Sequence, residues 1–243
     1  MKNSSAIRAD AWKALGENGQ YLRYVSAYLL LTLVTVVVSI PLMGILGVGI
    51  GVSGIAPFFA PGGHPEIGLF LDPAVMLPLL ASAFVFSLLA IYPIGYVTWG
   101  NSAMAIAAMR RGLTVGHAFS GWGHGWKMGW IMAVKVTYIN LWALLLFVPG
   151  VIKAISYAMT DYIAIDHPDW SANQCITESR RLMDGNKLRY FCLMLSFIGW
   201  FILVAVANCI PLVGNFAQWY FMPYFESAKA AFYEDLLDND AEA

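Results

Sequence analysis

Long apolar segments constrain the fold of this chain more than any other feature. A helix that crosses the hydrocarbon core of a bilayer needs about 20 predominantly apolar residues. Five segments meet or approach that length: residues 24–51, 74–96, 127–148, 191–207 and 210–231. A sixth, 150–165, is shorter and more polar, and as a helix it would extend about 24 Å. Only 12% of the 243 residues are charged, whereas soluble domains contain about 25%. The sequence therefore predicts an all-α integral membrane protein, a bundle of about six spanning helices.

The positions of the basic residues predict the orientation. Lys and Arg accumulate in short loops on the cytoplasmic side of a membrane. Twelve of the 14 lie before the first apolar segment, between the second and third, between the fourth and fifth, or beside the last. They are Lys2, Arg8, Lys13, Arg23, Arg110, Arg111, Lys127, Arg180, Arg181, Lys187, Arg189 and Lys229. This distribution fits an even number of spans, with both termini in the cytoplasm.

These positions predict one integral membrane domain over residues 1–243. Its expected parts are a cytoplasmic surface helix (1–23), a first hairpin (24–111), a second hairpin (112–166), a surface helix with a third hairpin (167–237) and an acidic tail (238–243). A threefold repeat of surface helix, span, turn and span is a further hypothesis. It rests on three aligned positions, Ala11, Leu15 and Asn18 with Ser179, Met183 and Asn186.

Residues 172–184 have the pattern of an amphipathic helix. Ser171 and Gln174 form a capping box, and Gly185 supplies the stop. The apolar face consists of positions three, four or seven residues apart, namely Ala172, Cys175, Ile176, Ser179, Leu182 and Met183. Two interpretations stay open: this face lies at the lipid headgroups, or it packs on the underside of the bundle.

Charged residues within the apolar segments need a reason, because burying a charge in hydrocarbon is costly. If Lys127 and Asp166 mark the cytoplasmic surface, Lys135 lies about 12 Å and Asp161 about 7.5 Å above it. Helical side chains lean toward the N-terminus of their own helix, so these two side chains lean toward each other. The sequence predicts that Lys135 and Asp161 form an ion pair. Lys153 leans the other way, toward the opposite membrane surface.

Two more residues complete the candidate polar network. Glu226 lies near the depth of Lys135 and is a competing partner for it. Tyr157 adds a hydroxyl group four residues from Lys153 and from Asp161, a spacing that places all three on one helical face. The candidate intramembrane polar network therefore comprises Lys135, Tyr157, Asp161 and Glu226. It is interpreted as structural, with a proton or solute pathway as the alternative.

Motifs for catalysis or cofactor binding are not recognisable. We identify no nucleophile motif, phosphate-binding glycine loop or paired catalytic carboxylates. His117 and His124 lie close in sequence, but a metal site needs more ligands than two. The net charge of −1 and the lack of a basic tail argue against a nucleic-acid partner. No catalytic residue, cofactor or metal is predicted.

Three stretches resemble one known family. They are "AWKALGEN" (11–18), "FVPGVIKAISYAMTDYIAIDHPDWSANQCITESRRLMDGNKLRYFCLMLSFIGW" (147–200) and "MPYFESAKAAFYEDLL" (222–237). The chain resembles the bacterial integral membrane proteins known as domain of unknown function 975. It is more remotely similar to the membrane domain found beside some glycerophosphodiester phosphodiesterases. The resemblance implies a bacterial inner (plasma) membrane location and carries over no catalytic residue.

Three functional hypotheses follow. The first is a non-enzymatic scaffold, modulator or lipid-associated membrane component, with membrane lipid and an unidentified membrane protein as partners. The second is a small-solute transporter or permease that uses the polar network. A membrane enzyme acting on lipid ranks third. A dry, fully paired network favours the first hypothesis, and a water-accessible path to it favours the second.

Overall fold

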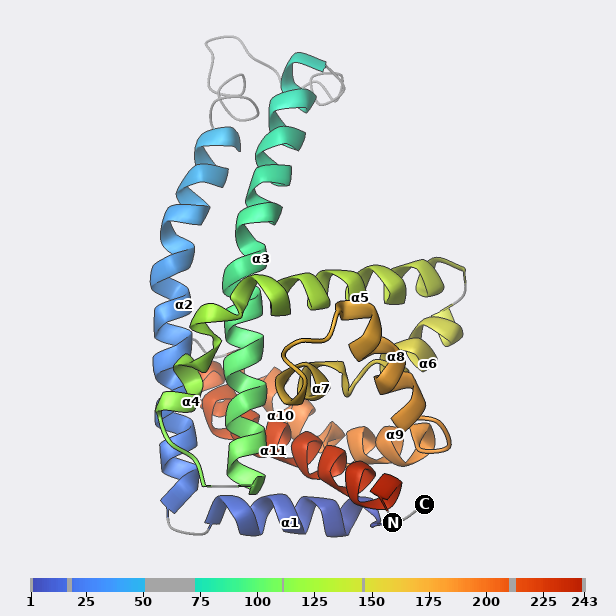
Figure 1. Cartoon of the computed structure of the whole chain (residues 1–243). Helices are drawn as coiled ribbons and strands as arrows, with labels where there is room; N and C mark the ends of the chain where they lie inside the picture. Colours follow the sequence, from blue (N-terminus) through green and yellow to red (C-terminus); the bar gives the residue numbers. More distant parts are fainter. Residues whose placement is uncertain are drawn as a thin grey trace.

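The computed structural model describes residues 2–16, 19–50, 73–110, 112–145, 147–209 and 213–241 (Figure 1). Within these residues every regular element is helical, which confirms the all-α expectation. The elements are α1 (Ser4–Gly16), α2 (Gln20–Ile50), α3 (Pro73–Arg110), α4 (Gly116–Phe119), the 3₁₀ helix η5 (Ser120–Gly123), α5 (Gly125–Leu145), α6 (Phe147–Ser156), α7 (Thr160–Asp166), α8 (Ala172–Leu182), α9 (Lys187–Leu195), α10 (Ile198–Ala207) and α11 (Val213–Ala241).

The two longest helices, α3 and α2, run side by side and extend beyond the rest of the molecule (Figure 1). α5 crosses α3 steeply (Figure 1), with glycines at the contact. A Cβ atom on Gly95 would overlap the backbone oxygen of Gly125, and one on Gly129 would overlap that of Ile91. Small residues let helix backbones approach this closely. The steep crossing differs from the near-parallel packing that a bundle of six spans implies.

α1 lies across the base of the molecule, next to α11 (Figure 1). Ile7, Ala11 and Leu15 form its buried face. The two ends of the described chain also meet, because the backbone N–H of Lys2 donates to Oδ1 of Asp235 at 3.2 Å. Both ends therefore lie on the same side of the fold.

The amphipathic helix expected at 172–184 is present as α8. Ser171 and Gln174 form the predicted capping box, and Gly185 has a left-handed φ of 74°. Its predicted face, from Ala172 to Leu182, is buried against helices that include α5 and α7. Of the two interpretations left open by the sequence, packing on the chain's own helices is the one observed.

Among the side chains that the structure describes, one segment has the length and composition of a membrane span by itself, Gln20–Val37 of α2. α9 and α10 pass the same test together, although they are bent by 41° at their junction. The count is thus one such helix, or two if the bent pair is one span. Six spans remain a prediction.

Candidate functional site

The helix expected over residues 150–165 is interrupted. α6 ends at Ser156 and α7 begins at Thr160. The fully buried Ser179 of α8 bridges the interruption. Its Oγ donates to the carbonyl oxygen of Ser156 at 2.9 Å and accepts from the backbone N–H of Met159 at 3.2 Å. Buried backbone groups freed by a helix break need partners, and α8 supplies them here.

This interruption corrects two expectations. Lys153, Tyr157 and Asp161 do not share one continuous helical face, because α6 and α7 are separate helices. The sequence also predicts that Lys153 and Arg180 lie at opposite surfaces of the membrane. In the structure both residues line the same groove. This second expectation is wrong because α6 stays beside α8 and α9.

The predicted ion pair between Lys135 and Asp161 is present. Nζ of Lys135 lies 2.7 Å from Oδ1 and 2.8 Å from Oδ2 of Asp161. The two side chains are only 11% and 16% exposed. The pair connects α5 to α7, the helix immediately after the break. A buried pair of this geometry holds two helices in one register, since either charge alone would be left without compensation.

Glu226 belongs to a different pair. Its carboxylate contacts Nζ of Lys229 at 2.9 Å and 3.0 Å, and the hydroxyl of Tyr162 donates to it at 3.2 Å. Glu226 is therefore not the partner of Lys135. The four candidate residues divide into the Lys135–Asp161 pair, the Glu226–Lys229 pair and Tyr157, which contacts neither pair through its hydroxyl group.

Tyr157 instead lies beside two basic residues. It lines a hollow of about 350 Å³ with Lys153 and Arg180. A second hollow of about 420 Å³ shares Lys153, Arg180 and Thr177 with the first. The two are contiguous, and we refer to them as the Lys153–Arg180 groove. It is formed by α5, α6, α8 and the first residue of α9.

A cluster at the ends of α3, α7 and α11 has no counterpart in the sequence predictions. Both terminal nitrogens of Arg110 donate to Asp166 at 2.8 Å, and its Nε donates to Glu234 at 2.6 Å. The hydroxyl of Tyr233 also donates to Asp166, at 2.9 Å. The hydrogen bond with Asp166 raises the pKa of Arg110. Burial raises the pKa of Glu234, and Arg110 partly offsets that effect. The available signal was that Arg110, Asp166 and Glu234 each follow a predicted apolar segment on the predicted cytoplasmic side.

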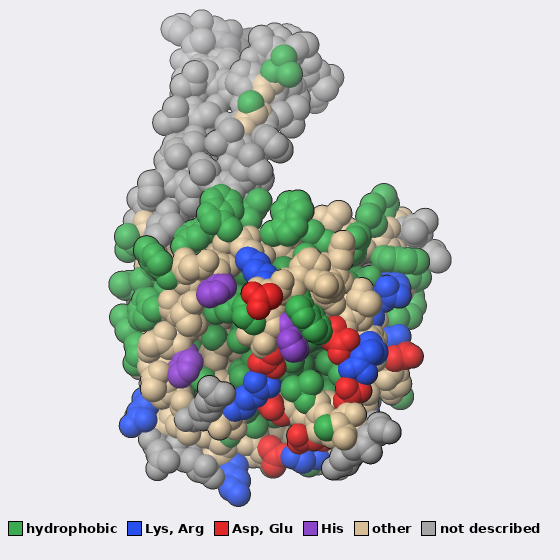
Figure 2. Space-filling view, in the orientation of Figure 1, with side chains coloured by type: hydrophobic (Ala, Val, Ile, Leu, Met, Phe, Trp, Pro, Cys, Tyr) green, Lys and Arg blue, Asp and Glu red, His purple; other side chains and the backbone are tan. Residues whose placement is uncertain are grey.

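Large apolar side chains are exposed over much of the molecule. None of the ten residues of α10 is buried, although all are apolar or glycine. Figure 2 shows apolar side chains along the upper rim of the body, with charged side chains gathered below them. Exposed apolar residues outside α10 include Leu33 and Val36 on α2, Trp126, Trp130, Leu141 and Leu144 on α5, and Val148 on α6. Contiguous apolar surface of this kind marks contact with a membrane or a partner.

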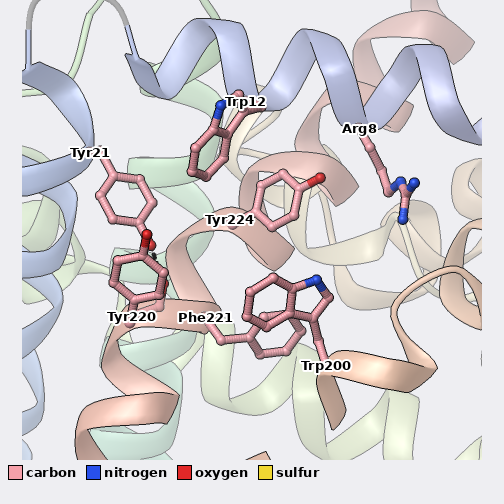
Figure 3. A pocket seen from close by; sticks show the side chains of 7 residues that line it. All are labelled: Arg8, Trp12, Tyr21, Trp200, Tyr220, Phe221 and Tyr224. Atoms are coloured by element: carbon pink, nitrogen blue, oxygen red, sulfur yellow. Dashed lines mark hydrogen bonds between the residues drawn. The ribbon is translucent and has the colours of Figure 1, made fainter. Parts of the chain in front are cut away.

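A second cleft, of about 340 Å³, lies between α1, the start of α2, α10 and α11 (Figure 3). Six aromatic side chains surround it together with Arg8. Nη1 of Arg8 donates to the carbonyl oxygen of Ser196 at 3.1 Å. Trp12 packs edge-on against Tyr224, with ring centroids 5.4 Å apart. The cleft can accept a flat apolar group, but its rings already have partners among themselves.

The two histidines considered in the sequence line a third cleft, of about 400 Å³. His124 stacks on Trp99 with ring centroids 4.3 Å apart, and Nδ1 of His117 contacts Oγ1 of Thr114 at 2.8 Å. Among the described residues, no group of three or more His, Cys, Asp or Glu side chains can hold a metal ion.

These observations define, for the described residues, an all-helical protein with exposed apolar side chains on several helices and charge pairs between helices. The family model described as "Protein of unknown function (DUF975)" matches residues 103–240, more than half of the chain. The chain belongs to this family, as its sequence motifs indicate. No curated protein and no solved structure matches it. The remoter similarity to the phosphodiesterase membrane domain is not supported by these comparisons and stays an expectation.

Proposed function

We propose that this protein is a non-enzymatic, multi-pass component of the bacterial inner membrane, with both termini in the cytoplasm. The observation that carries the proposal is α10, in which ten apolar or glycine residues form a helix with no buried side chain. A helix that is apolar on every side is stable inside a protein core or in lipid. α10 packs on α11 through Trp200 and Phe201. Its remaining surface is exposed in the described parts of this chain, and we assign lipid to that surface.

The charge pairs support a structural role for the polar network. Lys135 is paired with Asp161 and Glu226 with Lys229, each with a contact below 3 Å. A solute or proton pathway needs polar groups that can exchange partners with water or ligand. The Lys135–Asp161 pair instead holds α5 to α7. Glu226 and Lys229 pair within α11, and Glu226 also accepts a hydrogen bond from Tyr162 of α7. This arrangement favours the scaffold or lipid-associated component over the transporter.

In the proposed arrangement, α2 and α3 cross the bilayer as one hairpin and the bent pair α9–α10 enters it. The α5–α6 hairpin returns on the side where it began, because Lys153 shares a groove with Arg180. If the chain crosses the bilayer only as complete hairpins, its two ends lie on the same side of the membrane. This is consistent with the basic residues near both ends of the chain.

Nitroxide scanning in lipid tests the proposal. Single labels at the most exposed positions of α10, Ile198, Ile202, Leu203 and Val206, should be accessible to oxygen and protected from an aqueous nickel reagent. Labels along α8, from Ala172 to Leu182, should instead oscillate with a period near 3.6 residues, because one face is buried. High nickel accessibility throughout α10 would place it in water and refute the proposal.

A further inference from the structure

We propose that the Lys153–Arg180 groove binds the phosphate headgroup of an anionic membrane phospholipid. This inference extends the proposed membrane function by assigning a ligand class to one site. It depends on the balance of charge in the groove, on a tyrosine hydroxyl group that lines it and on the apolar surface beside the groove.

The charge balance leaves two cations available. Four basic side chains line the groove: Lys153, Arg180, Arg181 and Lys187. Arg181 is neutralised by Glu178 and Asp240, each at 2.7 Å. Lys187 lies 3.6 Å from Asp184.

Lys153 and Arg180 are the remaining two. Neither makes an ion pair with any carboxylate that the structure describes. Lys153 is held by the ring of Trp142, with Nζ 4.6 Å from its centroid. Two uncompensated cations at one groove select an anion.

Tyr157 adds a hydrogen-bond donor to this site. The residue is only 4% exposed, and it lines the groove together with Lys153 and Arg180. Its hydroxyl group has no hydrogen-bond partner among the described residues. A phenolic hydroxyl can donate a hydrogen bond, and an anion held by Lys153 and Arg180 would supply the acceptor.

The apolar surroundings favour a lipid over a free phosphate. Trp142 and Tyr138, which line the groove, are 41% and 37% exposed. Such aromatic residues gather at the level of lipid headgroups. Leu144 on α5 and Ile152 on α6 are exposed too. A phospholipid can place its phosphate between the cations and lay its acyl chains on this apolar surface.

Native mass spectrometry of the detergent-solubilised protein tests the site. The dissociation constant of the first bound phosphatidylglycerol is measured, with phosphatidylcholine as the comparison lipid. Each cation near an anionic headgroup contributes about fivefold to affinity. Lys153→Gln and Arg180→Gln should each weaken phosphatidylglycerol binding about fivefold, and the double variant about 25-fold. Tyr157→Phe should weaken it about fivefold, the contribution of one hydrogen bond.

Lys13→Gln is the control. It removes the same charge from an exposed lysine of α1 that does not line the groove. It should leave phosphatidylglycerol binding unchanged within about twofold, because a distant exposed charge is screened. An equal loss in Lys13→Gln and Arg180→Gln would overturn the proposal, because it would reveal only non-specific attraction.

Two further outcomes would also overturn it. One is equal affinity of the wild-type protein for the two lipids. The other is displacement of phosphatidylglycerol by millimolar inorganic phosphate, which would identify a soluble anion as the ligand. Failure of the site is distinguishable from failure of the membrane proposal. If the α10 labels lie in lipid and no headgroup preference is found, only the groove assignment fails.

Discussion

Breaking the Lys135–Asp161 pair should destabilise the protein strongly. The pair has two contacts of 2.7 and 2.8 Å and side chains that are at least four-fifths buried. Removing one member of a buried pair costs about 3–5 kcal/mol, because the other charge is left uncompensated. Residual exposure and local water soften that cost, so we expect about 3 kcal/mol for Lys135→Met or Asp161→Asn. For a chain of this size that corresponds to a decrease in midpoint temperature of about 6–12 °C.

The double variant tests the mechanism. Lys135→Met with Asp161→Asn leaves no orphan charge, so its loss should be smaller than the sum of the two single losses by about 2 kcal/mol. The measurement is thermal unfolding of the purified protein in detergent, followed by tryptophan fluorescence and size-exclusion chromatography. Arg181→Gln serves as the control. It breaks the two ion pairs of an arginine whose side chain is 52% exposed, and it should cost less than about 1 kcal/mol.

Additive losses would refute the reasoning, because they would mean that the two side chains do not depend on each other. Single variants that retain full stability but abolish uptake of a solute would also refute it. That result would make the pair functional and would favour the transporter hypothesis.

Three more predictions follow from individual contacts. Ser179→Ala should lower the free energy of unfolding by about 2–4 kcal/mol, because it leaves buried backbone groups at the α6–α7 break without partners. Its control in the same unfolding assay is Ser227→Ala, which should be nearly neutral because Ser227 is equally buried but has no described hydrogen-bond partner. Gly129→Ala should cost about 2–3 kcal/mol by forcing α3 and α5 apart, whereas Gly199→Ala, where a Cβ meets nothing within 4 Å, should not destabilise; equal losses would exclude the close crossing. The topology can be tested with single cysteines at positions 64 and 239, in a background lacking Cys175, Cys192 and Cys209. Position 64 lies outside the described residues. The two cysteines should react with an impermeant thiol reagent from opposite sides of the membrane, and labelling of both from outside would contradict the topology.

Local features were predictable from the sequence because nearby residues determine them. The cap at Ser171, the stop at Gly185 and the buried face of α8 depend on helical spacing alone. The Lys135–Asp161 contact was also predictable, since its argument needs only the level of each residue on its helix and the lean of the side chain.

The other features could not be predicted from the sequence, because they depend on tertiary contacts between residues far apart in the chain. The break after Ser156 depends on a hydrogen-bonding side chain 23 residues further along the chain, and no spacing rule within residues 150–165 reveals it. Without the break, Lys153 is assigned to the wrong surface and the Lys153–Arg180 groove does not exist. The steep crossing of α3 and α5 likewise depends on glycines from two helices meeting. Apolar length alone cannot distinguish a spanning helix from one that crosses its neighbour.

Alkaline carbonate extraction of bacterial membranes tests the central claim, that this chain is an integral membrane protein, most directly. High pH strips peripheral proteins from membranes and leaves those whose helices are surrounded by lipid. We expect the full chain to stay in the membrane pellet after the carbonate wash and to be released only by detergent. Quantitative release of the folded chain into the carbonate supernatant would contradict the account.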